Sequence, residues 1–354
     1  MNKNILKTGV QNFIEKSMDA DIVSVLFKKP IFELVSNKEL VQQIQSKAKC
    51  KKKLPRWYNT PKIYYPKVLN IEQASSESTA VYKSEIVSGN SLCDLSGGFG
   101  IDSFFFDKKM ETVVHCEIDK ELSQIATYNF SVLGAKNIRT IADDGIEFLK
   151  KEKRTFDWIY IDPSRRNHIK EKVFKLKDCL PNVPDNLDFL FQKSSNLMLK
   201  TSPLLDIEAG LKELKHVLEI HVVALHNEVK ELLWVLKKGF KGEAEIKTVN
   251  IKDDVKEIFN INISKEKKEV SKFLEPLPYL YEPNVAILKA GAFKSVGHVY
   301  ELYKLHQHTH LYTSEKYIEF PGRRFKIDQV VTYSKKTLKN LGSKRPISPF
   351  VIFP

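Results

Sequence analysis

The sequence predicts an α/β protein with a doubly wound parallel sheet, preceded by a helical segment and followed by a small α+β domain. From about residue 91 to 245, apolar runs of strand length alternate with runs of helical length. Before residue 60, apolar residues recur mostly at three- and four-residue steps, and after about residue 252 the alternation loosens. We therefore expect three domains, at residues 1–88, 89–251 and 252–354.

The N-terminal domain is expected to be helical up to residue 60. The stretch LPRWYNTPKIYYP at 54–66 holds three prolines and four aromatic residues, which predicts an extended linker packed against the protein. A short helix is predicted over residues 75–87, because Ser75 or Ser76 can cap its start and Gly89 follows its end.

Strands in the central domain are predicted at 91–95, 111–117, 137–142, 156–161, 195–201, 217–225 and 244–251. Helices are predicted between them, for example at 101–109, 120–133 and 228–238. The last two strands, joined through KKGFKGEAE, fit an antiparallel pair. In the C-terminal domain we expect strands at 258–263, 308–313 and 325–334 and a helix at 298–305.

Composition and charge narrow the class of protein. The 354 residues are 42% hydrophobic and 29% charged, which is typical of a soluble globular protein. No apolar run approaches the ~20 residues of a membrane-spanning helix, and the N-terminus has no hydrophobic signal core, so we expect a cytoplasmic protein. The four cysteines form no CxxC pair, so we expect no structural zinc.

The net charge of +13 is unevenly distributed. Residues 1–90 hold 15 Lys and Arg against 8 Asp and Glu, residues 91–240 hold 22 against 23, and residues 241–354 hold 20 against 13. Two basic flanks around a neutral centre suit a polyanionic substrate such as RNA. The alternative is a solvated, lysine-rich surface, since only eight of the 57 basic residues are Arg.

A small-residue loop, DLSGGFG at 94–100, follows the first strand of the central domain. Asp94 ends the strand, and Ser96, Gly98 and Gly100 let a ligand approach the backbone closely. A dinucleotide fingerprint would have a third glycine where Ser103 stands. The loop fits S-adenosylmethionine (SAM) better.

The next two strands also end in acidic residues. Glu117, followed by Ile118, lies 17 residues after Gly100, where a carboxylate can bind ribose hydroxyls. Asp143 or Asp144 ends the third strand and can accept a hydrogen bond from the adenine amino group, or simply cap the following helix. We expect all four residues to contact the cofactor.

The sequence DPSRR at 162–166 ends the fourth strand, at the corner that faces the methyl donor. Asp162 can orient the nucleophile or accept a proton, and Pro163 fixes the turn before Ser164. Arg165 and Arg166 can bind a phosphate or carboxylate, or form a solvated pair. Lys200 to Pro203 can line the acceptor pocket or form a turn.

These motifs carry a family resemblance. DLSGGFG, CEID, ADD and YIDPSRR resemble motifs I to IV of class I SAM-dependent methyltransferases, with Ser96 where the first glycine usually stands. IEQASSESTAVYK, YLYEPNVAILKAGAF, HTHLYTS and FPGRRF resemble a bacterial family of these enzymes with a C-terminal THUMP-like, ferredoxin-like domain. The resemblance covers roughly residues 55–335. It implies a Rossmann-like fold, methyl transfer from SAM and RNA binding.

Motif IV limits the reaction. Adenine N6 methylation usually uses an aromatic residue after Asp-Pro, and here Ser164 and Arg165 follow. Cytosine C5 chemistry needs a cysteine nucleophile at this turn or on the next strand, and neither segment has one. Direct transfer to a nitrogen or oxygen remains, with no metal required.

Candidate RNA contacts lie in the C-terminal domain. Tyr281 can stack on a base or pack at a domain interface, and Arg323 and Arg324 stand between phenylalanines as at many RNA-binding surfaces. His306, His308 and His310 lack the neighbouring ligands of a metal site.

We therefore expect a SAM-dependent RNA methyltransferase. The alternatives are a SAM-dependent enzyme that acts on a protein or small molecule and a non-catalytic RNA-binding protein. A nicotinamide-dependent enzyme is the weakest alternative, because the third fingerprint glycine is absent.

Overall fold

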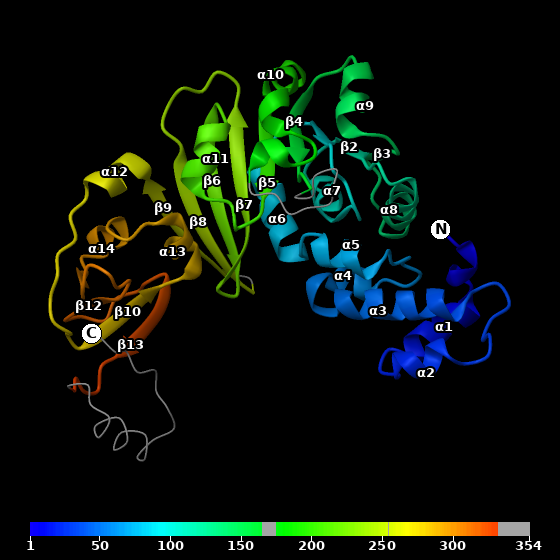
Figure 1. The fold of residues 1–354 in the computed structure, drawn as a ribbon, viewed down its shortest axis with the longest axis horizontal. Coiled ribbons are helices and arrows are strands. Elements are labelled where there is room, and N and C mark those ends of the chain that lie inside the picture. The colour runs from blue at the N-terminus through cyan, green and yellow to red at the C-terminus, as the bar shows by residue number, and fades with distance from the viewer. Residues whose placement is uncertain (165–174, 254, 332–354) are drawn as a thin grey trace.

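The computed structural model describes residues 1–164, 175–253 and 255–331. The N-terminal part is helical, as predicted (Figure 1). Its longest helix, α3, begins at a capping box in which Ser36 and Glu39 satisfy each other's backbone N–H groups. The elements are η1 (Lys3–Leu6), α1 (Thr8–Lys16), α2 (Ile22–Leu26), α3 (Asn37–Lys53), α4 (Pro55–Asn59), α5 (Val68–Gln73) and α6 (Glu77–Ile86).

Nine strands form one sheet in the order β3-β2-β1-β4-β5-β7-β6-β8-β9. The first five strands in this order, β3, β2, β1, β4 and β5, are parallel. Strand β7 lies between β5 and β6 and is antiparallel to both. Strands β6 and β8 are parallel, and β9 is an antiparallel edge strand. The strands are β1 (Ser91–Asp94), β2 (Thr112–Cys116), β3 (Ile138–Ile141), β4 (Phe156–Ile161), β5 (Ser194–Thr201), β6 (Val217–Leu225), β7 (Glu228–Lys237), β8 (Glu245–Lys252) and β9 (Val255–Asn262).

Helices connect the parallel strands, so the doubly wound prediction is confirmed. They are α7 (Ile101–Phe106), α8 (Lys120–Val132), α9 (Gly145–Lys151), η2 (Leu176–Asp178), α10 (Val183–Lys193) and α11 (Ile207–Glu213). The chain leaves β1 toward β2 and β3, and β4 leads to β5 on the other side. The crevice outside the carboxyl ends of β1 and β4 is therefore the place where such sheets bind ligands.

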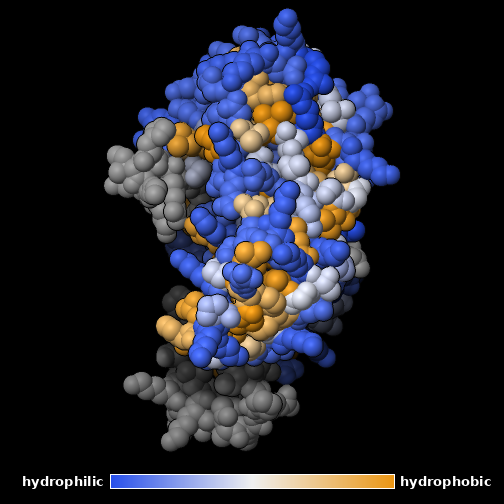
Figure 2. All heavy atoms as spheres, turned by 90° about the vertical axis from the view of Figure 1, so that its right-hand side faces the viewer, coloured by the Kyte–Doolittle hydropathy of each residue, from blue (hydrophilic) through white to orange (hydrophobic). Residues whose placement is uncertain are grey.

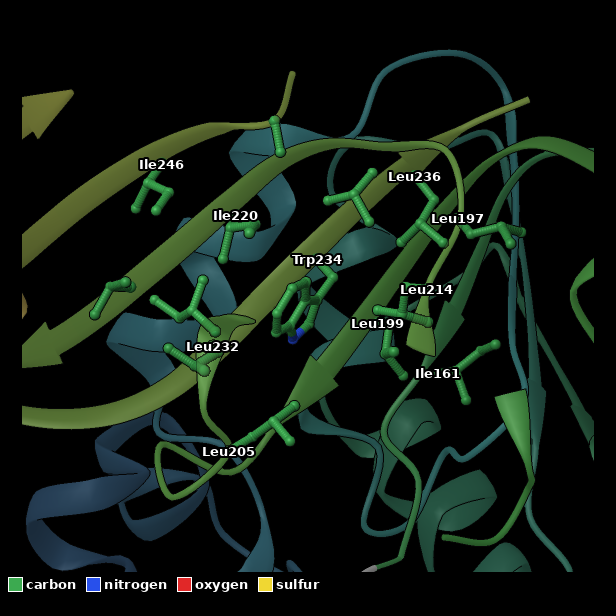
Figure 3. Packing of buried hydrophobic residues seen from close by; sticks show 14 of the residues in the cluster. Ile161, Leu197, Leu199, Leu205, Leu214, Ile220, Leu232, Trp234, Leu236 and Ile246 are labelled. Atoms are coloured by element: carbon green, nitrogen blue, oxygen red, sulfur yellow. The ribbon is translucent and has the colours of Figure 1, made fainter. Parts of the chain in front are cut away.

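Trp234 is central to the largest hydrophobic core (Figure 3). Its side chain is fully buried, its indole N–H donates to the Thr201 hydroxyl at 3.0 Å, and leucines of β5 and β7 surround it. A Cβ on Gly210 would lie 2.3 Å from the indole, so α11 can pack this closely only with glycine at that position.

Two predictions around β7 were wrong. The segment predicted as a helix at 228–238 is strand β7, joined to β6 by a tight turn in which His226 and Asn227 have positive φ angles. The strands predicted as an antiparallel pair, now β6 and β8, are parallel neighbours. The apolar run LLWVL fits a strand buried on both faces as well as a buried helix, and the sheet decides between them.

The C-terminal part forms a second, four-stranded sheet in the order β11-β12-β10-β13. The helix predicted at 298–305 is only partly helical, because its last residues form a strand, and the strands predicted at 308–313 and 325–334 are shorter and shifted. The elements are α12 (Ile263–Lys268), β10 (Tyr279–Pro283), α13 (Val285–Ala290), α14 (Ser295–Val299), β11 (Tyr303–Lys304), β12 (Tyr312–Ser314) and β13 (Gly322–Lys326).

Helix α13 packs against β6, β7 and β8, so the two sheets share one hydrophobic core. Asn284, which caps α13, also donates to Glu257 of β9 at 3.1 Å. The division into domains at residues 88 and 251 stays a prediction; β9, which begins after residue 251, belongs to the large sheet.

On the face shown in Figure 2, hydrophobic side chains lie among hydrophilic ones over the N-terminal helices. Phe27, just after α2, is 81% exposed. None of the helices in the described ranges has the length and apolar character needed to cross a membrane.

Candidate active site

The glycine loop, residues 95–100, joins β1 to α7 and is tied to the neighbouring strand. Gly97 donates its N–H to the Cys116 carbonyl at 2.8 Å. A Cβ at Gly97 would lie 2.1 Å from the His115 ring, and a Cβ at Gly100, whose φ is +89°, would lie 2.4 Å from Phe130. These two positions therefore need glycine, so that the loop can pack against β2 and α8.

Asp94 lies beneath this loop, with 1% of its surface exposed. It accepts hydrogen bonds from the Ser96 N–H at 3.0 Å and the Ser103 hydroxyl at 2.6 Å. Burial raises the pKa of Asp94 to about 7. His115, which contacts Ser103 at 3.0 Å, is fully buried, and burial lowers its pKa to about 3.

Glu117 follows β2 and faces the same loop. Its carboxylate accepts from the Gly98 N–H and the Asp119 N–H, both at 2.8 Å. Burial raises the pKa of Glu117, although these two hydrogen bonds act to lower it. Ile118 is 69% exposed beside it. The structure thus brings Asp94, Ser96, Gly98, Gly100 and Glu117 together.

Asp143 and Asp144 follow β3. Asp144 caps α9 by accepting from Ile146 at 2.8 Å and Glu147 at 3.0 Å, which is the helix-cap role. Asp143 is half-buried and pairs with Lys151 at 3.1 Å, a bond that lowers its pKa. Gly145 packs on the glycine loop, because its Cβ would lie 2.6 Å from the Leu95 carbonyl oxygen.

The acceptor corner consists of Asp162, Pro163 and Ser164 after β4 and Lys200 near the end of β5. Asp162 donates its N–H to the Ser96 hydroxyl at 2.6 Å, which joins this corner to the glycine loop. Its carboxylate forms an ion pair with Lys200. Ser164 exchanges two backbone hydrogen bonds with Leu180, at 2.7 and 3.1 Å. Arg165 and Arg166 lie outside the described residues.

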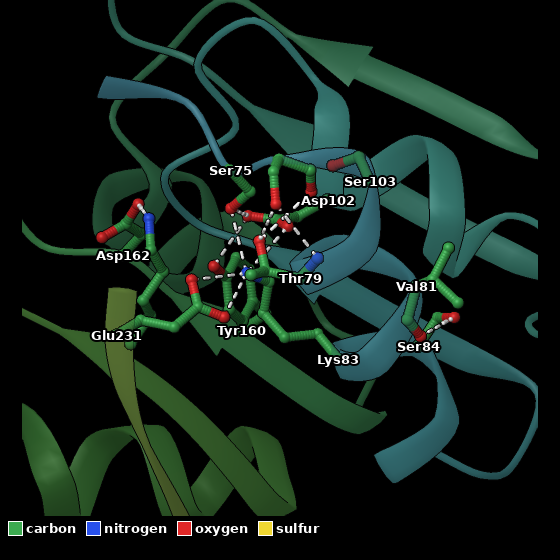
Figure 4. A network of polar contacts seen from close by, with 12 residues as sticks. Ser75, Thr79, Val81, Lys83, Ser84, Asp102, Ser103, Tyr160, Asp162 and Glu231 are labelled. Carbon is green, nitrogen blue, oxygen red and sulfur yellow. Dashed lines mark hydrogen bonds and ion pairs between the residues drawn. The ribbon is translucent and has the colours of Figure 1, made fainter. Parts of the chain in front are cut away.

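A buried charge cluster of Lys83, Asp102 and Glu231 lies behind this corner (Figure 4). The Lys83 ammonium is 3.2 Å from Asp102 and 2.8 and 2.9 Å from the two oxygens of Glu231. Asp102 also accepts from the hydroxyls of Ser75 and Tyr160, both at 2.8 Å. All three charged residues are buried, Lys83 completely.

Strand geometry explains why these charges meet. Lys200 pairs in register with Leu233, and Glu231 lies two residues before Leu233, so both side chains point to the same face of the sheet. Tyr160 of β4 and Asp162, which directly follows β4, reach the same cluster: Tyr160 bonds to Asp102 and Asp162 pairs with Lys200. Helices α6 and α7 supply Lys83 and Asp102.

The cluster determines the charge of Lys200. Burial alone would lower the pKa of Lys200, but the carboxylates of Asp162, Glu231 and Asp102 outweigh burial and raise it. Burial raises the pKa of Glu231, whereas Lys83 and Lys200 outweigh burial at Asp102 and lower its pKa. Lys200 is therefore a stable cation beside Asp162.

The predicted RNA contacts of the C-terminal part lie elsewhere, in the four-stranded sheet at the far end of the molecule from β1 (Figure 1). Tyr281 is fully buried and donates its hydroxyl to the Lys316 carbonyl at 2.9 Å, so its ring offers no free face for stacking. Arg323 pairs with Glu282 and Arg324 with Glu319.

The three histidines for which the sequence predicts no metal site, His306, His308 and His310, also lie in the C-terminal part. His310 stacks on Phe293, with ring centroids 3.8 Å apart. Within the described ranges, no three His, Cys, Asp or Glu residues are grouped as metal ligands would be.

Comparisons with known proteins bear on the fold and the family. Residues 279–321 match a family model described as a ferredoxin-like domain. A 98-residue stretch is 33% identical to an "uncharacterized RNA methyltransferase" of Mycoplasma mobile and covers 27% of the length of that relative.

A solved structure covers nearly the whole chain. The crystal structure named "putative methyltransferase from Porphyromonas gingivalis W83" superposes with a TM-score of 0.86 and 31% sequence identity, over 96% of this chain and 86% of that one. This match extends through both sheets. The chain therefore belongs to the family of class I SAM-dependent methyltransferases that carry a C-terminal ferredoxin-like domain.

Proposed function

We propose that this protein transfers a methyl group from SAM to a nitrogen or oxygen atom of RNA. The hydrogen bond from the Asp162 N–H to Ser96 carries the proposal, because it places the acceptor corner directly against the glycine loop. The Mycoplasma relative, named as an RNA methyltransferase, supports RNA as the substrate.

The residues around the glycine loop suit SAM. Gly98 has a φ of +56°, and the nearest atom to a Cβ there would be the Ser96 carbonyl oxygen at 3.9 Å, so a bare backbone surface is open at this position. Glu117 and Asp143 offer carboxylates for hydroxyl and amino groups, and Ile118 offers an exposed apolar surface. When bound, SAM supplies an electrophilic methyl group on its sulfonium.

The chain's own residues would then position the acceptor. Asp162, fixed through its N–H by Ser96 and through its carboxylate by Lys200, can accept a hydrogen bond from the attacking nitrogen or oxygen. Orientation of this kind supplies much of the rate in a direct transfer. A cysteine, Cys179, does lie beside the Ser164–Leu180 bridge. Its thiol is buried and contacts the Lys175 carbonyl, so it is not presented to the acceptor as a nucleophile.

The test is transfer of radiolabelled methyl from SAM to total RNA isolated from a strain that lacks this gene. We expect label that RNase removes and protease does not. Asp162→Ala should abolish transfer and keep SAM affinity, measured by calorimetry. Label that only protease removes would instead identify a protein acceptor, and no label with SAM bound would indicate a protein that binds without methylating.

A further inference from the structure

A basic surface on the N-terminal helices borders the acceptor corner. Between Glu39 and Glu72 the sequence holds eight Lys and Arg and no Asp or Glu. This stretch folds into most of α3, all of α4 and the segment that leads to α5. We call Lys49, Lys51, Lys52 and Arg56, all exposed, the α3–α4 basic surface.

Most of these charges have no acidic partner. Lys49 pairs with Glu72 at 2.9 Å. In the part of the chain that the structure describes, the side chains of Lys51, Lys52 and Arg56 form no salt bridge. The carboxylate of Glu77 accepts from the backbone N–H of Arg56 at 2.5 Å, not from its guanidinium. The positive charges of these three side chains are therefore available to an external anion.

Packing places this surface beside the glycine loop. Trp57 of α4 contacts Phe99 of that loop and Phe104 of α7, with ring centroids 6.3 and 5.0 Å apart. Lys53 donates to the carbonyls of Ile71 and Glu72 at 2.9 and 2.7 Å. Those residues lead to Ser75, which bonds to the buried charge cluster, and Figure 1 shows α3 to α5 next to α6 and α7.

One lysine of α3, Lys53, lies on the side of the helix that approaches the acceptor corner. Burial, with repulsion from Lys200 and Lys230, lowers the pKa of Lys53 to about 8. The repulsion from Lys200 indicates that Lys53 of α3 lies near the acceptor corner. Lys53 thus connects the α3–α4 basic surface to the neighbourhood of the acceptor corner, where Lys200 is already paired with Asp162.

The C-terminal sheet provides the contrast. Arg323 and Arg324 are each engaged by a glutamate, so a phosphate would have to displace a carboxylate. Binding RNA to unpaired cations instead gains free energy through release of counterions.

We propose that the α3–α4 basic surface binds the phosphate backbone of RNA and delivers the nucleotide to the acceptor corner. This assignment rests on the proposed function, since it assumes that RNA is the substrate. It makes the N-terminal helices the principal RNA-binding element.

Two triple variants test this, each with three positive charges removed. One is Lys51→Gln, Lys52→Gln, Arg56→Gln. The matched control is Lys265→Gln, Lys267→Gln, Lys268→Gln on α12, a helix with no buried residue. The probe is a fluorescein-labelled 20-nucleotide single-stranded RNA of mixed sequence, followed by fluorescence anisotropy from 50 to 300 mM KCl.

We expect the α3–α4 variant to bind about 10-fold or more weakly at 100 mM salt. The slope of log K against log salt should become shallower by about 2, because each of the three lost phosphate contacts contributes roughly 0.7 to the slope. The control should change less than about threefold. Calorimetric SAM affinity and thermal unfolding should be unchanged in both, which separates lost contacts from misfolding.

Equal losses of RNA affinity in the two variants, or no loss in the α3–α4 variant, would overturn this assignment but would not contradict the proposed methylation of RNA. No RNA binding by the wild-type protein would overturn both. Displacement of the RNA by poly-L-glutamate at equal charge would show that the surface is no RNA-backbone site.

Discussion

The ammonium of Lys200 forms an ion pair with the carboxylate of Asp162 across the neighbouring ends of β5 and β4. The lysine side chain is 13% exposed and the aspartate 32%, so the cation is on the protein side of the pair. Lys200 therefore orients the carboxylate toward the crevice, where the acceptor would lie.

Lys200→Met should lower kcat by about 10- to 100-fold, because a misplaced catalytic group costs about that much. SAM affinity should stay within about threefold of wild type. Lys200→Arg should recover part of kcat, because it keeps the positive charge. Single-turnover methylation and calorimetry measure both quantities; full activity in Lys200→Met would remove the residue from the positioning of Asp162.

Lys83→Met should lower the free energy of unfolding by about 3–5 kcal/mol, because it leaves Asp102 and Glu231 buried without their cation. Urea denaturation measures the change. The matched control is Lys150→Met, which breaks an ion pair whose side chains are 54% and 51% exposed and should cost about 0–1 kcal/mol. Equal losses of unfolding free energy in the two variants would show that burial does not determine how much these ion pairs stabilise the protein.

Gly97→Ala should destabilise the protein by about 1–3 kcal/mol, since its Cβ would lie 2.1 Å from His115. SAM affinity should fall with it. Gly9→Ala, where only Phe32 lies near at 3.9 Å, should stabilise α1 by about 0.5–1 kcal/mol. Adding His115→Ala to Gly97→Ala should cost less than the sum of the two changes; strict additivity would contradict the clash.

Asp94 should make stability depend on pH. Its folded-state pKa of about 7 lies above the ~3.9 of an unfolded chain, so the folded state holds the extra proton in this window. Its contribution to the free energy of unfolding is therefore present at low pH and is lost as pH rises from about 4 to 7.

His115, with a pKa of about 3, acts in the opposite direction. The difference between wild type and Asp94→Asn isolates the aspartate. Urea denaturation at pH 5 and pH 8 should show that wild type loses more stability than the variant as the pH rises. No difference between the two proteins would indicate that Asp94 is ionised throughout this range.

The sheet's first half could be predicted from the sequence because each of its strands is a short apolar run that ends in a turn. β7 could not, because ELLWVL contains good helix formers and no alternation, and only its position between β5 and β6 makes it a strand. The parallel pairing of β6 and β8 likewise depends on the strand that intervenes.

The glycine loop could be predicted because its residues are contiguous in the sequence, and Glu117 because it directly follows a recognisable strand. The buried charge cluster was not, since Lys83 and Glu231 lie 148 residues apart and each is an ordinary charged residue in its own segment.

The contact between Trp57 and Phe99 has a consequence for the whole N-terminal part. The indole is fully buried, so a rearrangement of the glycine loop would disturb the packing of α4. We therefore expect a ligand that immobilises the loop also to slow the local opening of α3 and α4, although it touches neither. Hydrogen exchange in these helices would then report cofactor occupancy at a distance.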